Sequence, residues 1–299
     1  MWFRNLQLYR LPVNWDIPLD RLDEQLTRQR FRPCGSQDLA TQGWISRQPD
    51  GPLVHSVGGQ WLVALGIEQR LLPSSVVKQV AADRAEEIEA QQGYKPGRKQ
   101  MKEIREAVTQ ELLPRAFTRR RRIFAWIDPK AGWLVVDASS RKAADSVVET
   151  LHKSLDELPL KLLNTRRSPA SAMTEWLVAN EAPGAFTIDQ DCELRAVTEE
   201  KSAVRYVRHT LEGKEVREHI EAGKQASRLA LSWNDRLSIV LNDKLELKRL
   251  QFLDVVTEAA GDGADADEQF DTDFALMSAE LRNFFPALIE ALGGEEPTI

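Results

Sequence analysis

GWISRQPDGPLVHSVGGQWLVALGI, residues 43–67, predicts three consecutive strands and decides the fold class of the chain. Its three strand-like runs are separated by Pro-Asp-Gly and by Gly-Gly, which are typical turn sequences. The predicted strands are residues 43–47, 53–57 and 60–67. Residues 2–11 are predicted as a strand and residues 18–30 as a helix. The order of strand, helix and meander favours an α+β fold with mixed or antiparallel sheets over a repeated βαβ unit.

A different pattern, with apolar residues three and four positions apart, covers residues 74–113. It predicts a helix at 74–92 and a second helix at 98–113, joined by a turn that contains Pro96. The apolar stripe is narrow and the remaining surface is heavily charged. We therefore expect a helical hairpin that projects from the body.

The rest of the chain alternates between predicted strands and helices. Strands are predicted at residues 123–127, 133–136, 185–196, 203–209, 226–232, 237–242 and 245–252. Helices are predicted from Ser139 or Ser140 onward, at residues 171–180 and at residues 216–222. Near the C-terminus an acidic joint at 261–268 precedes an amphipathic helix at 270–288, which Pro286 should kink or interrupt. The apolar stripe of that helix fits core packing, with a dimer contact as the alternative.

Four regions follow from these elements. We predict a central α+β domain at residues 1–73 and 123–170, a helical-hairpin tip, or finger, at 74–122, a β-rich base domain at 171–260, and an acidic joint with a C-terminal amphipathic helix at 261–299.

The composition restricts the class of protein. With 299 residues, of which 42% are apolar, the chain can bury a substantial core. No apolar run approaches the roughly 20 residues that span a bilayer, and the N-terminal residues carry charge where a signal peptide is apolar. The two cysteines, Cys34 and Cys192, cannot build a cysteine-rich zinc site. We expect a cytoplasmic protein without cofactor, metal site or membrane contact.

The net charge of −6 hides a strong asymmetry. Residues 251–299 hold twelve acidic residues and one basic residue, which leaves 34 acidic and 39 basic residues in 1–250. The body is therefore positive and the C-terminal segment strongly negative. This asymmetry favours a body that contacts a polyanion, although a solvated acidic surface explains the segment equally well.

Catalytic motifs are absent from the sequence. It contains no P-loop, no dinucleotide-binding glycine motif, no nucleophile elbow and no HExxH. The acidic cluster of residues 262–273 lacks the glycine and distal glutamate of an EF-hand. Its carboxylates lie in a loop and a first helical turn, whereas a two-metal nuclease needs them on rigid elements. A nuclease built on this cluster is thus the weaker alternative.

Basic residues carry the strongest signal. Arg115 and Arg119, Arg120, Arg121 and Arg122 lie beside Phe117, Phe124 and Trp126. Arginines neutralise phosphates, and exposed aromatic rings can stack on bases. Phe124 and Trp126 fit core positions of a strand. Phe117 follows a helix-stopping proline among charges, and it is either a local anchor for the arm or an exposed contact.

A second basic stretch lies in the predicted base domain. Its candidate DNA-binding residues are Arg205, Arg208, His209, Lys214, Lys224 and Arg228. The sequence contains no helix-turn-helix, zinc finger or RNA-recognition motif that could read bases. Dispersed basic residues of this kind predict contact with the DNA backbone and no sequence preference.

Several long blocks resemble one known family. They are WFRNLQLYRL at 2–11, FRPCGSQDLATQGW at 31–44, LLPSSVVKQ at 71–79, ELLPRAFTR at 111–119, WID at 126–128, MTEWL at 173–177, HIEAGK at 219–224 and FDTDFALMSAEL at 270–281. Together they resemble the bacterial recombination-associated protein family RdgC over essentially the whole chain.

The resemblance implies a homodimer closed into a ring, with DNA passing through a positively charged central hole. It implies binding to duplex and single-stranded DNA, restraint of RecA-promoted strand exchange, association with the nucleoid, and no catalytic activity. By position, Phe117 would belong to the finger-like tip where the two subunits close the ring. Arg208 and His209 match a basic-polar pair that is often Lys-Gln in the family, and His209 departs from that pattern.

Two readings from other classes stay open beside a DNA-encircling ring. One is a protein-interaction factor that acts directly on the RecA filament. The other is the metal-dependent nuclease described above.

Overall fold

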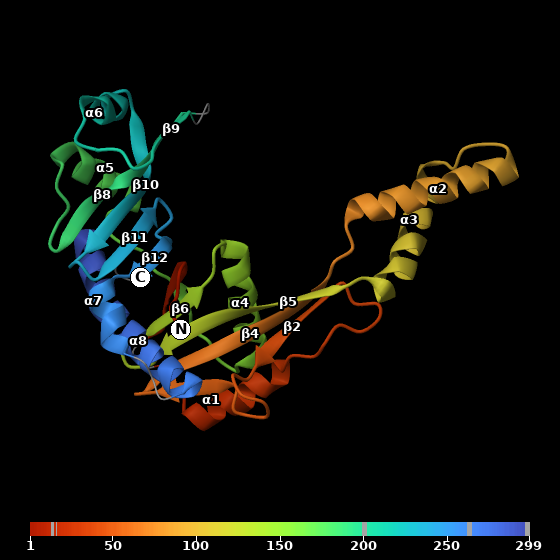
Figure 1. The fold of residues 1–299 in the computed structure, drawn as a ribbon, viewed down its shortest axis with the longest axis horizontal. Helices are drawn as coiled ribbons and strands as arrows, with labels where there is room; N and C mark the ends of the chain where they lie inside the picture. Colours follow the sequence, from red (N-terminus) through yellow and green to blue (C-terminus); the bar gives the residue numbers. More distant parts are fainter. Residues whose placement is uncertain (13–14, 16, 199–201, 262–264, 297–299) are drawn as a thin grey trace.

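The computed structural model describes residues 1–12, 15, 17–198, 202–261 and 265–296. Within them, twelve strands form one antiparallel sheet with the main order β2-β4-β5-β6-β1-β12-β11-β10-β8-β9. β3 pairs with β4, and β7 pairs with β1. The molecule is an open crescent, with the sheet running through it from the base to the root of a helical arm (Figure 1). The predicted α+β class with antiparallel sheets is confirmed.

The strands are β1 (Leu6–Arg10), β2 (Ala40–Ile45), β3 (Val54–Val57), β4 (Gln60–Arg70), β5 (Thr118–Asp128), β6 (Trp133–Asp137), β7 (Lys161–Leu162), β8 (Phe186–Ala196), β9 (Ala203–Tyr206), β10 (Lys224–Trp233), β11 (Leu237–Asn242) and β12 (Leu247–Phe252). The helices are α1 (Leu19–Leu26), α2 (Ser74–Gln92), α3 (Arg98–Leu112), α4 (Arg141–Ser154), α5 (Pro169–Ala179), α6 (Lys214–Glu221), α7 (Asp254–Thr257) and α8 (Ala266–Ala291). Most predicted elements are present to within a few residues, whereas α7 and β7 were not predicted.

β1 joins the two halves of the sheet. On one side it pairs with β6 from Leu6–Asp137 to Arg10–Trp133, and on the other it pairs with β12 through Leu6 and Leu247. The predicted central and base regions therefore share one sheet.

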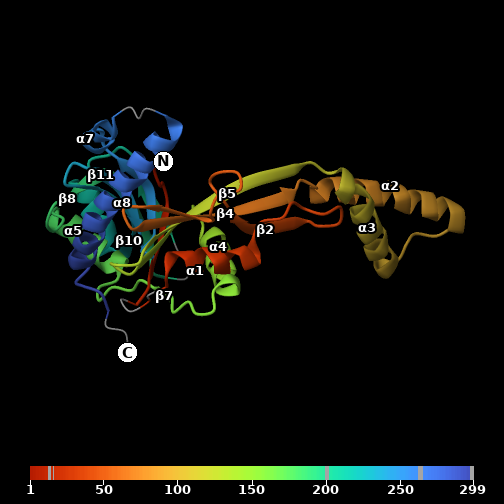
Figure 2. The same cartoon turned by 90° about the horizontal axis from the view of Figure 1, so that it is seen from below.

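Two apolar cores lie on opposite faces of β4 and β5. Leu62 and Trp126 face a core that includes α8, whereas Val63 and Ile127 face a core that includes α1 and α4. Figure 2 shows α1 and α4 together on one side of these strands. The alternation of side chains along a strand explains this division, because neighbouring residues point to opposite faces.

The C-terminal helix α8 is a core element. Its apolar residues Phe274, Met277, Leu281, Phe284 and Leu288 are all buried, which confirms the core-packing interpretation. The helix continues through Pro286 to Ala291, so the proline does not end it. Asp265 caps its first turn by accepting hydrogen bonds from the backbone N–H groups of residues 267 and 268.

α2 and α3 project beyond the ends of β4 and β5 (Figures 1 and 2). They pack around a small cluster in which only Ala81, Ile104 and Val108 are buried among the described residues. An ion pair between Arg84 and Glu111 links the two helices. The arm therefore has a much smaller apolar core than the rest of the chain.

No helix in the described ranges is both long enough and apolar enough to cross a membrane.

Candidate nucleic-acid interface

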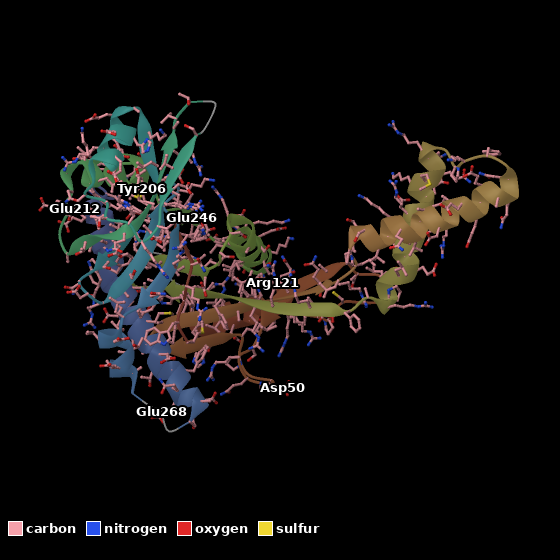
Figure 3. The ribbon with its side chains drawn as sticks, turned by 45° about the horizontal axis from the view of Figure 1, so that its top comes forward. Asp50, Arg121, Tyr206, Glu212, Glu246 and Glu268 are labelled. Carbon is pink, nitrogen blue, oxygen red and sulfur yellow. The ribbon has the colours of Figure 1, made fainter. Side chains whose placement is uncertain are left out.

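Strands β8 to β12, here called the base sheet, have one covered and one open face. Leu229 and Leu231 of β10 pack into the core with α5 and α8. Arg228, between Ser227 and Leu229, points to the opposite face and is exposed. In Figure 1, α5 lies on the outer side of the base sheet, so the open face is turned toward the inside of the crescent. In Figure 3, Tyr206 and Glu246 mark the base sheet and Arg121 marks β5 on the other limb.

A buried carboxylate organises the basic residues of the open face. Glu193 on β8 forms ion pairs with Arg195 at 2.7 Å and Arg205 at 2.5 Å, and it accepts a hydrogen bond from Ser227. Its side chain is only 4% exposed, whereas those of the two arginines are 45% and 62% exposed. Burial alone would raise the pKa of Glu193, but bonds from Arg205 and Ser227 and the charges of Arg228 and Arg195 lower it to about 2. The three guanidinium groups are therefore held around one fixed negative charge.

A shallow hollow of about 80 Å³ continues this surface toward β12. Lys248 and Arg249 line it together with Arg205 and Arg228. Arg249 is fixed by a 2.9 Å ion pair with Asp191. The hollow thus has four basic residues against two acidic ones, Asp191 and Glu193, in its lining. Such a surface attracts a polyanion without offering a base-reading element.

Residues 119–122 lie within β5, which begins at Thr118 and is longer than the predicted strand at 123–127. Four successive arginines show no alternation of apolar and polar residues, but β4 pairs with them from Gly66–Arg122 to Gln69–Arg119. β6 pairs only with Ala125–Asp128 of β5. The arginine-bearing half of β5 thus has a free edge within the described sheet, and all four arginines are exposed.

The strand divides these four arginines between two faces. Arg119 and Arg121 share the face of Ile123, which packs with α1 and α4, whereas Arg120 and Arg122 share the face of Trp126. Arg120 pairs with the carboxylate of Glu68, which is 4% exposed. Arg120 therefore has a structural role that the other three do not share.

The root of the arm is held by Arg70 at the end of β4. Its guanidinium donates to the carbonyl oxygens of Pro114 and Ala116 and to that of Gly35. Arg115, in the same segment, is exposed. Phe117 follows, and its backbone carbonyl accepts a hydrogen bond from the N–H of residue 71 at 2.7 Å.

The side chain of Phe117 is 84% exposed, the largest value for any large apolar side chain in the described chain. It therefore does not act as a local anchor that packs the arm onto the body. Phe117 lies where the arm joins β5, and the turn between α2 and α3 lies at the opposite end of the arm. An aromatic ring in this environment is available for a contact with another molecule.

Arg208 and His209 lie in the loop after β9. The backbone N–H of Arg208 donates to Asp191 at 2.8 Å, and φ of Arg208 is +51°, in the left-handed region. The Nδ1 atom of His209 lies 2.8 Å from the carbonyl oxygen of Thr210, and its ring packs near Tyr206. Asp191 links this loop to Arg249 of the open face.

Lys214 and Lys224 are associated with α6. Lys214 begins that helix and lies 3.6 Å from Glu218, and Lys224 is 3.3 Å from Nδ1 of His219 on the same helix. Because α6 packs on the covered side of the base sheet through the buried Val216, these lysines are separated from the cluster around Glu193. The structure thus brings Arg205 and Arg228 together but not all six predicted residues.

The acidic residues at the start of α8 have separate partners. Asp267 pairs with Arg47, Asp271 with His55, and Asp273 with the N-terminal amino group. Asp262 lies outside the described residues. Within the described ranges, no group of three or more His, Cys, Asp or Glu side chains is placed to hold a metal ion.

Comparison with known proteins gives one consistent match. A family model described as "Putative exonuclease, RdgC" matches residues 1–295. The chain is 56% identical over 299 residues to the recombination-associated protein RdgC of Dechloromonas aromatica (strain RCB), covering 99% of this chain and 98% of that protein. It is 53% identical over 296 residues to the protein of that name from Janthinobacterium sp. (strain Marseille), with 99% of both chains covered.

The chain belongs to the RdgC family. Its relatives are named for recombination, whereas the family description names an exonuclease. These RdgC relatives are therefore associated with DNA recombination by name, and none of the quoted names of the full-length relatives describes an enzyme.

Several residues of this RdgC chain that organise the basic surface were missed by sequence reasoning. They are Glu68, Arg70, Glu193, Arg195, Lys248 and Arg249. Glu193 and Arg195 are two residues apart, which places them on one face of a strand. The pairing of β8 with β9, which brings Arg205 opposite Glu193, follows only from the tertiary structure.

Proposed function

We propose that this protein is a non-enzymatic, sequence-independent DNA-binding protein that encloses DNA as a ring-shaped homodimer. In this proposal it restrains RecA-promoted strand exchange, modulates recombination and replication, and associates with the nucleoid in the cytoplasm. The observation that carries the proposal is the open face of the base sheet, where Arg195, Arg205 and Arg228 surround the buried Glu193 on the inner side of a crescent.

The chemistry of this surface supports binding to the phosphate backbone. Guanidinium groups recognise phosphates through charge-assisted hydrogen bonds, and binding releases the counterions of the DNA. Among the described residues, the open face is formed by strands and carries no helix that could enter a major groove. Binding through such a surface is independent of base sequence.

The crescent shape supports the ring. Two crescents related by a twofold axis can enclose a hole if they meet at both ends, and a twofold contact uses the same patch on each subunit. The exposed Phe117 at the root of the arm is a suitable residue for one of these contacts, because aromatic side chains are enriched among interface residues that contribute most to binding. The strongly acidic C-terminal segment would lie away from the phosphates.

A strand-exchange reaction with RecA tests the proposal against the protein-interaction alternative. The protein is added either to naked DNA before RecA or to DNA already coated by RecA. If the protein competes for DNA, inhibition is strong in the first order of addition and weak in the second. Equal inhibition of a complete filament would instead support direct action on RecA.

A further inference from the structure

A positively charged cavity of about 420 Å³ lies where β2, β4 and β5 come together. Among the described residues, its lining contains five arginines and one acidic residue, namely Arg30, Arg47, Arg120, Arg121, Arg122 and Asp50. Figure 3 labels two of them, Arg121 on β5 and Asp50 in the loop after β2. The volume is in the range of ligand sites, and the excess of positive charge favours an anionic occupant.

One part of the lining is apolar. Gly66 of β4 has no side chain, and a Cβ atom there would lie 2.7 Å from Cγ2 of Ile45 and 3.3 Å from Cδ2 of Phe31. Ile45 and Phe31 are half-buried, so each keeps part of its apolar surface open to the cavity. The cavity can therefore hold an apolar group beside an anionic one.

Helix α8 shows how an arginine of this cavity binds an acidic segment. Asp267, in the first turn of α8, pairs with Arg47 at 2.6 Å and accepts a hydrogen bond from the side chain of Gln48 at 3.1 Å. The guanidinium carbon of Arg47 also lies 4.2 Å from the centre of the Phe270 ring, three residues further along the helix. A carboxylate and an aromatic ring of one acidic segment thus bind the same arginine.

The other arginines of the lining differ in their partners. Arg120 pairs with the carboxylate of Glu68. Within the described ranges, no ion pair involves Arg30, Arg121 or Arg122, and all three side chains are exposed. Three guanidinium groups of the cavity are therefore available for another molecule.

We propose that this cavity is a docking site for an acidic peptide segment of a partner protein. A carboxylate of the bound segment lies between Arg30 and Arg122, and a large apolar side chain packs against Phe31 and Ile45. Arginine binds a carboxylate with two parallel hydrogen bonds, and an apolar anchor in a pocket often contributes much of the binding energy. The occupant repeats the combination of carboxylate and apolar side chain with which α8 binds Arg47.

The apolar part of the lining favours a peptide over a nucleic acid. Ile45 and Pro49 are aliphatic and offer no flat aromatic ring on which a base can stack. The guanidinium carbon of Arg120 lies 5.7 Å from the centre of the Phe31 ring, so this ring already has a cationic neighbour. Such a lining fits an apolar amino-acid side chain. The site adds a protein-binding function to the DNA binding proposed above.

Fluorescence anisotropy with three labelled hexapeptides tests the site. The probe Glu-Asp-Glu-Glu-Phe-Asp carries both features, Gln-Asn-Gln-Gln-Phe-Asn lacks the charges, and Glu-Asp-Glu-Glu-Ala-Asp lacks the aromatic ring. Arg30→Glu reverses one charge of the cavity, and Phe31→Ala removes an apolar contact. Arg98→Glu is the matched control, because it makes the same change at an exposed arginine of α3 on the arm. Arg122 stays unchanged, since it is also a candidate for DNA contact.

We expect the probe with both features to bind the wild-type protein and the uncharged probe not to bind. Arg30→Glu should weaken binding of the first probe about tenfold, whereas Arg98→Glu should stay within about twofold of the wild type. Phe31→Ala should weaken binding of the probe that contains Phe and leave the affinity for the probe that contains Ala unchanged. Equal losses of both acidic probes with Phe31→Ala would contradict the apolar contact.

Three further results would overturn the proposal. They are no binding of the first probe to the wild-type protein, equal losses with Arg30→Glu and Arg98→Glu, and displacement of the probe by oligothymidylate whose own affinity falls as much with Arg30→Glu. The last result would assign the cavity to nucleic acid. Duplex affinity is measured on the same proteins, and Arg30→Glu should match Arg98→Glu. Loss of the peptide site and loss of the proposed DNA binding are therefore distinguishable.

Discussion

The base sheet and the free half of β5 both present arginines, but on different supports. In the base sheet, Arg195 on the inner strand β8 and Arg205 on the edge strand β9 are both paired with the buried Glu193 of β8. In β5, residues 119–122 lie along a strand edge that β6 leaves unpaired, and only Arg120 has a buried carboxylate partner. One group of arginines is therefore oriented before any ligand arrives, and the other is free to adapt.

The difference indicates two uses of the same residue type. Fixed arginines lose little conformational entropy on binding and so favour affinity. Free arginines on an exposed edge also prevent another strand from pairing with it, which is a common use of charge at sheet edges. The comparison predicts that β5 can lose Arg119 and Arg121 without loss of stability, whereas the base sheet cannot lose Glu193.

The largest expected effect comes from reversing charge on β5. Arg119→Glu with Arg121→Glu should lower duplex affinity on the order of 100-fold, because two phosphate contacts become repulsive. Both residues are exposed, so the melting temperature should stay close to that of the wild-type protein. Anisotropy titrations and thermal unfolding measure the two quantities. Affinity like that of the wild type would assign the β5 arginines to protection of the edge alone.

Glu193→Gln should destabilise the fold by about 2 kcal/mol at pH 7, measured by urea unfolding. The pKa of Glu193 is lowered from 4.5 to about 2 in the folded protein. Because its arginine partners are exposed to solvent, the stabilisation is smaller than this pKa shift alone would give. Because the pKa is lower in the folded state, the stabilisation is present above pH 4.5 and is lost as the pH falls toward 2. The difference between variant and wild type should shrink over that range. A difference independent of pH would contradict this origin.

Arg205→Gln with Arg228→Gln should weaken duplex binding about tenfold, less than charge reversal on β5, because charge is removed and not reversed. Lys214→Gln with Lys224→Gln is the matched control, since it removes the same charge from the side of α6. The control should bind within about twofold of the wild type if duplex contact is restricted to the open face. Similar losses in both variants would mean that DNA also contacts the covered side.

Phe117→Ala should have the smallest effect on the isolated chain. The ring is 84% exposed, so its removal should leave the melting temperature within about 1 °C of the wild type. If Phe117 closes a ring, dissociation from closed circular DNA should become faster while dissociation from linear DNA of equal length changes little. Equal changes on both substrates would remove Phe117 from ring closure.

The sequence was informative where local patterns determine the structure. The turns around residues 43–67, the two helices of the arm and the apolar stripe of α8 follow from spacing and turn chemistry, and all are present. The start of β5 was missed because four successive arginines show no alternation, and its strand conformation depends on pairing with β4. The continuity of the sheet through the Leu6–Leu247 contact joins residues far apart in the chain and leaves no local signal.

The residues of the candidate site likewise fall into those that the sequence identifies and those that only the tertiary structure reveals. Exposed arginines were identifiable from composition, as was the unusual position of Phe117. The carboxylates that hold arginines, Glu68 and Glu193, were not identifiable, because an acidic residue in a strand gives no sign of which basic residue lies opposite.

The salt dependence of duplex binding tests the central claim most directly. Dissociation constants are measured between 50 and 200 mM salt on two duplexes of equal length and unrelated sequence. If about six or more phosphates are neutralised, affinity should fall on the order of 10³-fold over this range, and equally for both duplexes. A flat salt dependence, or a strong preference for one of the two sequences, would contradict sequence-independent binding through the basic surface.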